Sequence, residues 1–215
     1  MLMIRILLSW ILVKIGANKI AFKLIIPFAV QGEPNSQTAI GAMYETGSGV
    51  AANYPEAIKW YQLAAERGFS NAQYNLALMY ANGRGGTANN IEAIKWYRLA
   101  ATQGNSRAQS NLGLLYDEGN IVPQDYLEAA KWYRLAAAND NSVAQVNLGV
   151  MYAEGKGVYR DYVRAYMWFS IAKGSRNASA LQGLDYMAGR MTKKQISEAQ
   201  AMASDCLKSR FIRCD

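Results

Sequence analysis

Few side chains in this chain of 215 residues are suited to chemistry, because histidine is absent. Histidine carries most proton transfer at neutral pH and is a frequent zinc ligand, so triads with a histidine base are excluded. The adjacent acids Asp117 and Glu118 resemble a paired-carboxylate site. Adjacent residues of a helix point about 100° apart, however, which favours a solvated helix end. We therefore predict no catalytic residue, no metal site and no small-molecule cofactor.

The two cysteines, Cys206 and Cys214, lie eight residues apart near the C-terminus. Further ligands for a metal are lacking there, and a redox pair would favour the closer Cys-x-x-Cys spacing. A structural disulfide and a pair of free thiols both remain open, and the disulfide is favoured. Because disulfides persist outside the reducing cytosol, the disulfide predicts a secreted, periplasmic or envelope-associated protein, with the cytoplasm as the alternative.

Two further motifs resemble ligand-binding sequences. Residues 95–98 and 131–134 both read Lys-Trp-Tyr-Arg and interleave basic and aromatic side chains, as single-strand nucleic-acid binders do. These aromatic residues fall on or beside the packed face of a helix, which favours core packing. Residues 83–86, Gly-Arg-Gly-Gly, lack the preceding strand and the lysine-serine pair of a phosphate loop.

The formal charge of +7 is concentrated at the two ends of the chain. Residues 1–30 carry four basic and no acidic side chains, and residues 173–215 carry eight basic and four acidic ones. Residues 31–172 carry eleven basic and twelve acidic side chains. Because the middle of the chain is close to neutral, we predict no nucleic-acid partner.

The elements that position these side chains repeat every 36 residues. This spacing relates Trp60, Trp96, Trp132 and Trp168; Tyr44, Tyr80, Tyr116 and Tyr152; Gln37, Gln73, Gln109 and Gln145; and Gly47, Gly83, Gly119 and Gly155. A fixed period of this length indicates a repeat array.

Each repeat is predicted to contain two helices, as the second repeat illustrates. A first helix over residues 71–80 buries the face around Leu76, and Gly83 follows as a left-handed cap. A second helix opens near Asn89 or Asn90, either of which can cap it, and runs over residues 91–101. We call these helix A and helix B. Gly68, Gly104 and Asp140 mark the ends of successive B helices.

One helix pair cannot bury its own apolar face, so neighbouring pairs must stack. The predicted fold is all-α: a right-handed α/α superhelical solenoid of about four 36-residue helix-turn-helix repeats with a C-terminal capping helix. The repeats span residues 36–178, as about 36–71, 72–107, 108–143 and 144–178. Small residues at one position, Gly41, Ala77, Gly113 and Gly149, are expected to let the helices approach closely.

The repeat resembles a known family. Residues 108–116 read Ala-Gln-Ser-Asn-Leu-Gly-Leu-Leu-Tyr, and residues 125–133 read Asp-Tyr-Leu-Glu-Ala-Ala-Lys-Trp-Tyr. This pattern is similar to the Sel-one-like repeat, a relative of the tetratricopeptide repeat. The loops of the second and third repeats depart from the family's Gly-x-Gly-Val. The resemblance implies a non-catalytic adaptor or scaffold for a protein or peptide.

Two alternative functions come from the same resemblance. Cysteine-rich relatives are linked to cell-wall binding and to the binding or hydrolysis of β-lactams, although this chain lacks their paired repeat cysteines. A cytosolic signalling adaptor is the other alternative.

The ends of the chain allow several interpretations. Residues 1–30 are an export signal, a membrane anchor or a degenerate capping helix B, and membrane contact is predicted only through this segment. Arg5 followed by the apolar run 6–13 favours a signal, whereas Ala21 and Ala29 match helix B of the first repeat. Residues 179–215 are predicted to cap the array, with Thr192 and Gln195 forming a capping box.

The partner-binding surface is predicted on the side of helix A opposite the Leu76 face, which in such solenoids lines a concave groove. It combines apolar centres with an acidic rim and so favours a peptide with apolar and basic side chains. Its residues are Tyr74, Leu78, Asn82, Ser110, Leu114, Asp117, Glu118, Val146, Val150 and Glu154.

Overall fold

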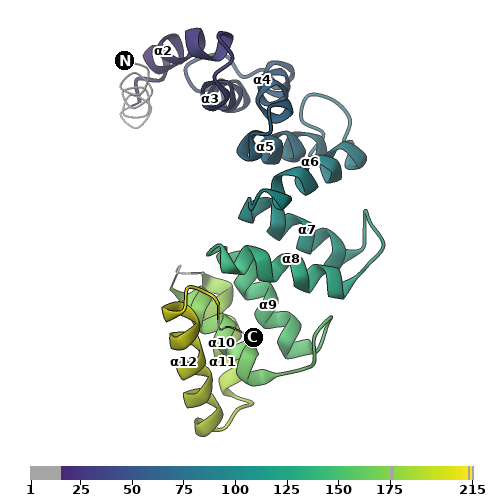
Figure 1. The fold of residues 1–215 in the computed structure, drawn as a ribbon, viewed down its shortest axis with the longest axis vertical. Helices are drawn as coiled ribbons and strands as arrows, with labels where there is room; N and C mark the ends of the chain where they lie inside the picture. The colour runs from purple at the N-terminus through teal and green to yellow at the C-terminus, as the bar shows by residue number, and fades with distance from the viewer. Residues whose placement is uncertain (1–15, 175–176, 213, 215) are drawn as a thin grey trace. The chain divides into compact units, whose positions relative to one another are not determined.

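The computed structural model describes residues 16–174, 177–212 and 214, and these form helices α2 to α12 without a strand (Figure 1). The chain divides into two compact units, residues 1–103 and 104–215. The predicted signal at residues 1–13 lies outside the described residues. No helix in the described part of the chain is long and apolar enough to cross a membrane.

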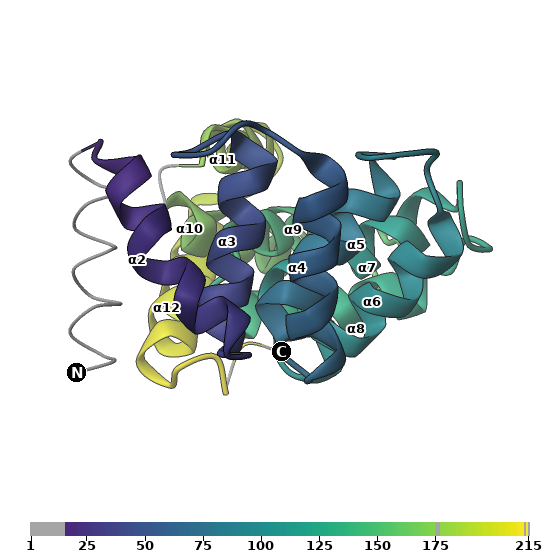
Figure 2. The same ribbon diagram turned by 90° about the horizontal axis from the view of Figure 1, so that it is seen from above.

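Residues 16–103 of the first unit form five helices in antiparallel succession, and α2, α3 and α4 lie side by side in Figure 2. They are α2 (Asn18–Val30), α3 (Pro34–Thr46), α4 (Tyr54–Glu66), α5 (Ser70–Ala81) and α6 (Asn90–Thr102). Helices α3 and α5 are A helices, and α4 and α6 are B helices. Helix α2 packs on α3 through the buried residues Ala21, Ile25 and Ala29.

The second unit continues the pattern with two further repeats and a C-terminal pair. Its helices are α7 (Ser106–Glu118), α8 (Tyr126–Ala138), α9 (Ser142–Glu154), α10 (Tyr162–Lys173), α11 (Ala178–Ala188) and α12 (Lys193–Lys208). Helices α7 and α9 are A helices, and α8 and α10 are B helices. Helix α12 packs on α10 as well as following α11, and it closes the core of this unit.

The N-cap residue of each B helix makes two hydrogen bonds, one that caps helix B and one that joins it to helix A. The side chains of Asn53, Asn89, Asp125 and Asp161 accept a hydrogen bond from the backbone N–H three residues later, at 3.0–3.2 Å. The backbone N–H of each also donates to the carbonyl of a repeat tyrosine, Tyr44, Tyr80, Tyr116 or Tyr152, at 2.8–2.9 Å. Of the two predicted caps of the second repeat, Asn89 is the one that caps α6, and its backbone N–H also joins α6 to the end of α5 by the hydrogen bond to Tyr80.

The A helices end at the repeat glycines. Gly47, Gly119 and Gly155 are left-handed C-caps with φ between +69° and +76°. In the second repeat α5 ends at Ala81 and its cap is Asn82 in the right-handed region, so Gly83 takes the positive φ one residue beyond the cap. Asp140 has φ +57° at the place where the other repeats have Gly68 and Gly104, as the sequence alignment of the repeats indicates.

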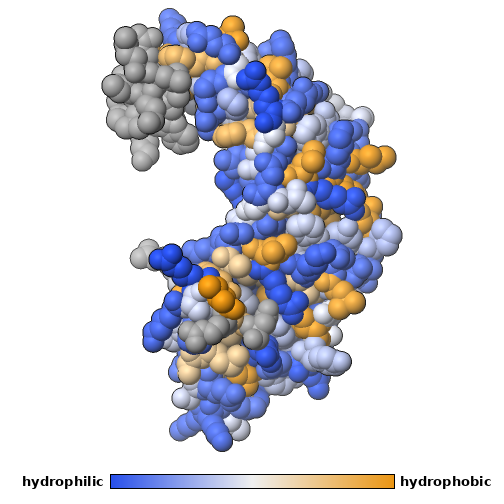
Figure 3. Space-filling model, viewed as in Figure 1, coloured by the Kyte–Doolittle hydropathy of each residue, from blue (hydrophilic) through white to orange (hydrophobic). Residues whose placement is uncertain are grey.

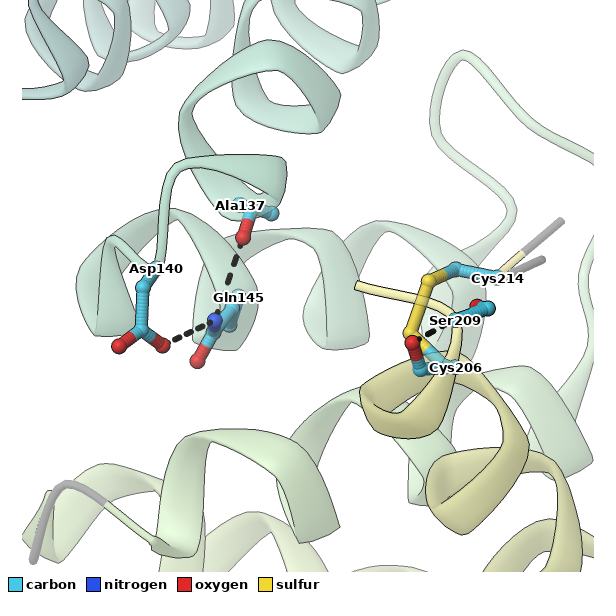
Figure 4. The surroundings of a disulfide bond; sticks show 6 residues. All are labelled: Ala137, Asp140, Gln145, Cys206, Ser209 and Cys214. Carbon is cyan, nitrogen blue, oxygen red and sulfur yellow. Dashed lines mark hydrogen bonds between the residues drawn. A yellow bond between two sulfur atoms is a disulfide. The ribbon is translucent and has the colours of Figure 1, made fainter. Parts of the chain in front are cut away.

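The repeat glutamines join each A helix to the preceding B helix. The side-chain amides of Gln37, Gln73 and Gln145 donate to the carbonyls of Ala29, Ala65 and Ala137, at 3.1–3.3 Å. Figure 4 shows the third of these bonds, with Gln145 of α9 directed at the last turn of α8. Each of these carbonyls also accepts a backbone N–H from the turn that follows its helix, from Gly32, Gly68 or Asp140, so the glutamine adds a second hydrogen bond at the end of the B helix.

Close helix contact depends on the small residues, as predicted. A Cβ atom on Gly41, Gly113 or Gly149 would lie 2.6–2.8 Å from the ring of Tyr61, Tyr133 or Phe169 on the following B helix. The predicted buried face of α6 is also confirmed, because Ala93, Tyr97, Ala100 and Ala101 are buried. In these contacts alanine and glycine pack against aromatic rings, and buried aliphatic side chains such as Ile40, Leu76 and Leu112 fill the rest of the core.

The C-terminal segment is fixed by a capping box and a disulfide. Thr192 and Gln195 form the predicted capping box at the start of α12. A disulfide joins Cys206 of α12 to Cys214, with the Cα atoms 4.7 Å apart and both residues buried (Figure 4). The last residues of the chain are thereby attached to the core of the second unit.

Candidate functional site

The residues predicted to bind a partner lie on A helices in both compact units, and each unit is described separately. In the second unit Leu114 of α7 and Val150 of α9 occupy the same place in consecutive repeats. Helices α7 and α9 contact each other. The two side chains are 41% and 38% exposed, although both are aliphatic. We name Leu114, Val150, Asp117, Glu118 and Glu154 the second-unit A surface.

In the first unit the predicted residues lie on and just beyond α5. Leu78 is half-buried and Asn82 is exposed. Tyr74 is half-buried, and its ring packs against that of Tyr97 on α6 with the centroids 6.1 Å apart. Tyr74 therefore contributes to helix packing, and Leu78 is the predicted aliphatic contact on α5 that stays partly exposed.

Ser110 and Val146 are buried, contrary to their expected place on an open surface. Each precedes a close-packed glycine, Gly113 or Gly149, by three residues. A separation of three places them only about 60° from that glycine around the helix, at the edge of the packed face. Small side chains at this edge are covered by the neighbouring helices, so these two positions are not part of the second-unit A surface.

The acids of the second-unit A surface gather around a lysine in the α9–α10 loop. Lys156 Nζ lies 2.8 Å from Glu154 Oε2, and this hydrogen bond raises the pKa of Lys156. Burial raises the pKa of Asp117; Lys156 opposes this shift, while Glu154 and Glu118 add to it. Asp117 and Glu154 thus share Lys156, and Glu118 adds negative charge beside Asp117, so a basic group of a ligand would relieve the repulsion that Asp117 experiences.

A related cluster in the first unit is already neutralised. Glu45 at the end of α3 accepts a hydrogen bond from Tyr61 of α4 at 2.8 Å and forms an ion pair with Arg84. Arg84 follows Glu45 by 39 residues, and Lys156 follows Asp117, whose pKa it lowers, by the same number. A comparison of residues at 36-residue steps does not reveal this spacing of 39 residues.

The motifs at residues 95–98 and 131–134 divide between the core and the surface: their tyrosines are buried, and their lysines form surface salt bridges. Tyr97 and Tyr133 are buried, so their rings are unavailable for stacking on bases. Lys95 and Lys131 pair with Glu92 and Glu128, at 3.3 and 3.0 Å. Among the described residues no three acidic or cysteine side chains gather in an arrangement that could hold a metal ion.

On the face drawn in Figure 3 hydrophobic side chains form small patches separated by hydrophilic ones. Such a surface is ordinary for a folded protein, so the few aliphatic residues that share a helix face with an acidic cluster are the distinctive feature.

Comparison with known proteins finds four repeats in the chain. The family model of the Sel1 repeat matches residues 34–69, 70–105, 106–141 and 142–173. The chain belongs to the Sel1 repeat family. Each matched segment contains one A helix and one B helix, so the predicted α/α solenoid of about four helix-turn-helix repeats is confirmed.

Solved structures of other Sel1 repeat proteins are similar to this one. A Sel1 repeat protein from Oxalobacter formigenes is 30% identical with a TM-score of 0.80, and the match covers 98% of this chain and 92% of that one. A Sel1 repeat protein from Klebsiella pneumoniae subsp. pneumoniae is 21% identical with a TM-score of 0.56, covering 86% and 91%. No curated protein matches the chain. Sel1 repeat proteins are generally modules for protein–protein interaction, and this chain has their repeat architecture.

Proposed function

We propose that this Sel1 repeat protein is a non-catalytic adaptor or scaffold that holds a protein or peptide on its A helices. The ligand would place apolar side chains against Leu114 and Val150 and a basic side chain among Asp117, Glu118 and Glu154. In the first unit Leu78 and Asn82 are the candidate contacts.

The observation that carries the proposal is the joint placement of exposed aliphatic residues and an unbalanced acidic cluster. Leu114 and Val150 stand one repeat apart on contacting helices. The acids lie at the C-terminal ends of those helices, where the negative end of the helix dipole disfavours an ionised carboxylate. A basic group of a ligand would be favoured there by both the acids and the helix ends.

The test is a comparison of matched leucine variants. Leu114→Glu changes the second-unit A surface, whereas Leu135→Glu changes a B helix of the same unit at nearly the same exposure, 43%. Partners captured from the native organism by the unaltered protein should be lost with Leu114→Glu and Leu78→Glu and retained with Leu135→Glu. Circular dichroism should be the same for all. Equal retention by Leu114→Glu and Leu135→Glu would show that the surface is not the binding site.

We further propose that α2 caps the array at its N-terminal end. Three contacts support this role: Ala21 and Ala29 are buried against α3, and Gln37 donates to the Ala29 carbonyl as later glutamines do to later B helices. Deleting residues 1–30 should expose the apolar face of α3 and cause self-association, measured by light scattering. An unchanged monomeric fraction would contradict the role of α2 as a cap.

A place outside the reducing cytosol, secreted, periplasmic or envelope-associated, is proposed from the disulfide. Cys206 and Cys214 are buried and joined, and such bonds persist in oxidising compartments. Thiol titration of denatured, unreduced protein from the native organism tests this directly. Two free thiols would remove the support for export and favour a cytoplasmic adaptor.

A further inference from the structure

A second surface feature, distinct from the second-unit A surface, is a hollow between the B helices of the second unit. Its volume is about 720 Å³, and it is bounded by α8, by α10, by Tyr152 near the end of α9 and by the loop that joins α9 to α10. These segments can be followed in Figure 1. The volume falls within the range of about 300–1,000 Å³ that is typical of ligand pockets.

The hollow is lined by three arginines, Arg134, Arg160 and Arg164. Asp161 is the single acid among the described residues that line it. Both oxygens of Asp161 are engaged, because Oδ1 accepts from the backbone N–H of Arg164 at 3.0 Å and Oδ2 from its Nη1 at 2.6 Å. The lining therefore contains three guanidinium groups and one carboxylate, which caps α10 and pairs with Arg164.

The other two guanidinium groups lie beside aromatic residues. Arg134 Nη2 donates to the hydroxyl of Tyr152 at 3.1 Å, and Arg160 Cζ lies 5.7 Å from the ring centroid of Tyr162. These contacts hold the two guanidinium groups at the hollow. With three arginines and one aspartate, the lining carries more positive than negative side chains.

Comparison with the other repeats shows that the fold does not require this charge. The residues that stand where Arg164 does are Glu56, Glu92 and Glu128, and each pairs with a lysine three residues later, at 3.6, 3.3 and 3.0 Å. In the fourth repeat the lysine position holds Met167. The residues equivalent to Arg160 are Ala52, Ala88 and Gln124. The charge of this position is thus reversed in the fourth repeat alone.

The rim of the hollow is apolar and strongly exposed. Leu127 is 72% exposed at the start of α8, and Tyr159 in the α9–α10 loop is 96% exposed. Guanidinium groups form forked hydrogen bonds with carboxylates, and exposed aliphatic and aromatic side chains favour an apolar neighbour of that carboxylate. The lining therefore fits an acidic segment that also carries apolar side chains.

We propose that this hollow binds a carboxylate of an acidic, partly apolar polypeptide segment through Arg134, Arg160 and Arg164, with an adjacent apolar side chain on Leu127 and Tyr159. Its charge preference is opposite to that of the second-unit A surface. One chain would then carry two surfaces for two different ligands.

The test uses a fluorescein-labelled peptide in which glutamates alternate with leucines, and fluorescence anisotropy at low ionic strength. The variant combines Arg160→Gln with Arg164→Glu, which restores the acid of the earlier repeats. Asp125 followed by Glu128 shows that the fold accepts an aspartate cap followed by glutamate. The control combines Lys193→Gln with Lys194→Glu, two exposed residues of α12 in the same unit, and changes the net charge equally.

We expect the arginine variant to bind the peptide about tenfold or more weakly, while the lysine control and Leu114→Glu stay close to the unaltered protein. Equal weakening in the lysine control would show non-specific charge attraction and overturn the proposal. Unchanged binding by the arginine variant would overturn it as well. Displacement of the peptide by an equal concentration of inorganic phosphate would identify a small-anion site instead of a polypeptide site. Because Leu114→Glu addresses the other surface, failure of one proposal is distinguishable from failure of the other.

Discussion

Replacing Gly157 by alanine should destabilise the protein more than the same change at Gly155, two residues earlier in the same loop. Gly157 has φ +64°, and a Cβ atom there would lie 2.0 Å from the carbonyl oxygen of Tyr126 and 2.4 Å from its carbon. The left-handed conformation costs an alanine roughly 1–2 kcal/mol. Relieving the overlap requires movement of backbone at the start of α8, and overpacking of this kind costs about 1–3 kcal/mol. The expected loss of unfolding free energy is therefore about 2–5 kcal/mol.

Gly155 supplies the matched control. Its φ is +76°, so an alanine meets the same conformational cost, but the nearest atom to the added Cβ is the side-chain Cβ of Arg160 at 3.2 Å. Its loss should be about 1–2 kcal/mol. Urea unfolding followed by circular dichroism measures both, and hydrogen exchange of the α8 amides locates the effect. If Gly157→Ala costs no more than Gly155→Ala, the close approach of this loop to α8 is not a determinant of stability.

Three further changes test other parts of the structure. Asp117→Asn should raise stability at neutral pH by less than about 1 kcal/mol, because the side chain is partly exposed. The pKa of Asp117 is raised in the folded state, so the stability of the unaltered protein falls as the pH rises from the unfolded pKa of Asp117 to its folded pKa. Below the unfolded pKa the carboxyl group is protonated in both states. The urea midpoints of the unaltered protein and of Asp117→Asn should therefore converge at those lower pH values. Cys206→Ala with Cys214→Ala should lower the unfolding free energy by roughly 2–3 kcal/mol and abolish the effect of reductant on the thermal midpoint; a midpoint that still falls on reduction would contradict this. Gly113→Ala should cost up to about 2 kcal/mol in urea, since contact with the buried Tyr133 ring outweighs a gain of about 1 kcal/mol in helix propensity; a more stable variant would show that the ring can move.

The features that the sequence predicts correctly are those repeated at a fixed spacing. Helix pairs, the Asn89 cap and the small residue at Gly113 each recur every 36 residues, and each has a local physical cause. The Thr192–Gln195 capping box does not recur, but it too has a local cause, because both residues lie within one helical turn. Patterns within a repeat determine helix starts, helix ends and the packed face.

Contacts between repeats were harder to predict. The glutamine at 37, 73 and 145 is evident as a repeated residue, but its bond to the preceding B helix depends on where its side chain points. The pairing of Glu45 with Arg84 depends on two residues 39 positions apart, one in each repeat. The burial of Ser110 and Val146 depends on how far the next helix extends over the edge of the packed face.

The arginine hollow could have been found from the sequence. Glu56, Glu92 and Glu128 predict an acid at position 164, and the arginine there departs from the period in charge. The residues that the repeats share do not reveal the hollow, because it depends on a residue in which the fourth repeat differs from the others. The glutamate of the other three repeats is compatible with the fold, so folding alone does not account for the arginine at position 164.

The ties between successive helices join residues that are close in the sequence, which has a consequence for folding kinetics. Gln37 bonds to Ala29 eight residues earlier, and Asn53 bonds to Tyr44 nine residues earlier. Chains dominated by such short-range contacts lose little loop-closure entropy before they gain contacts, and they fold fast for their length. The tie of each helix to its predecessor can form as soon as that helix has been synthesised. The first unit is therefore able to fold while the ribosome is still adding the second.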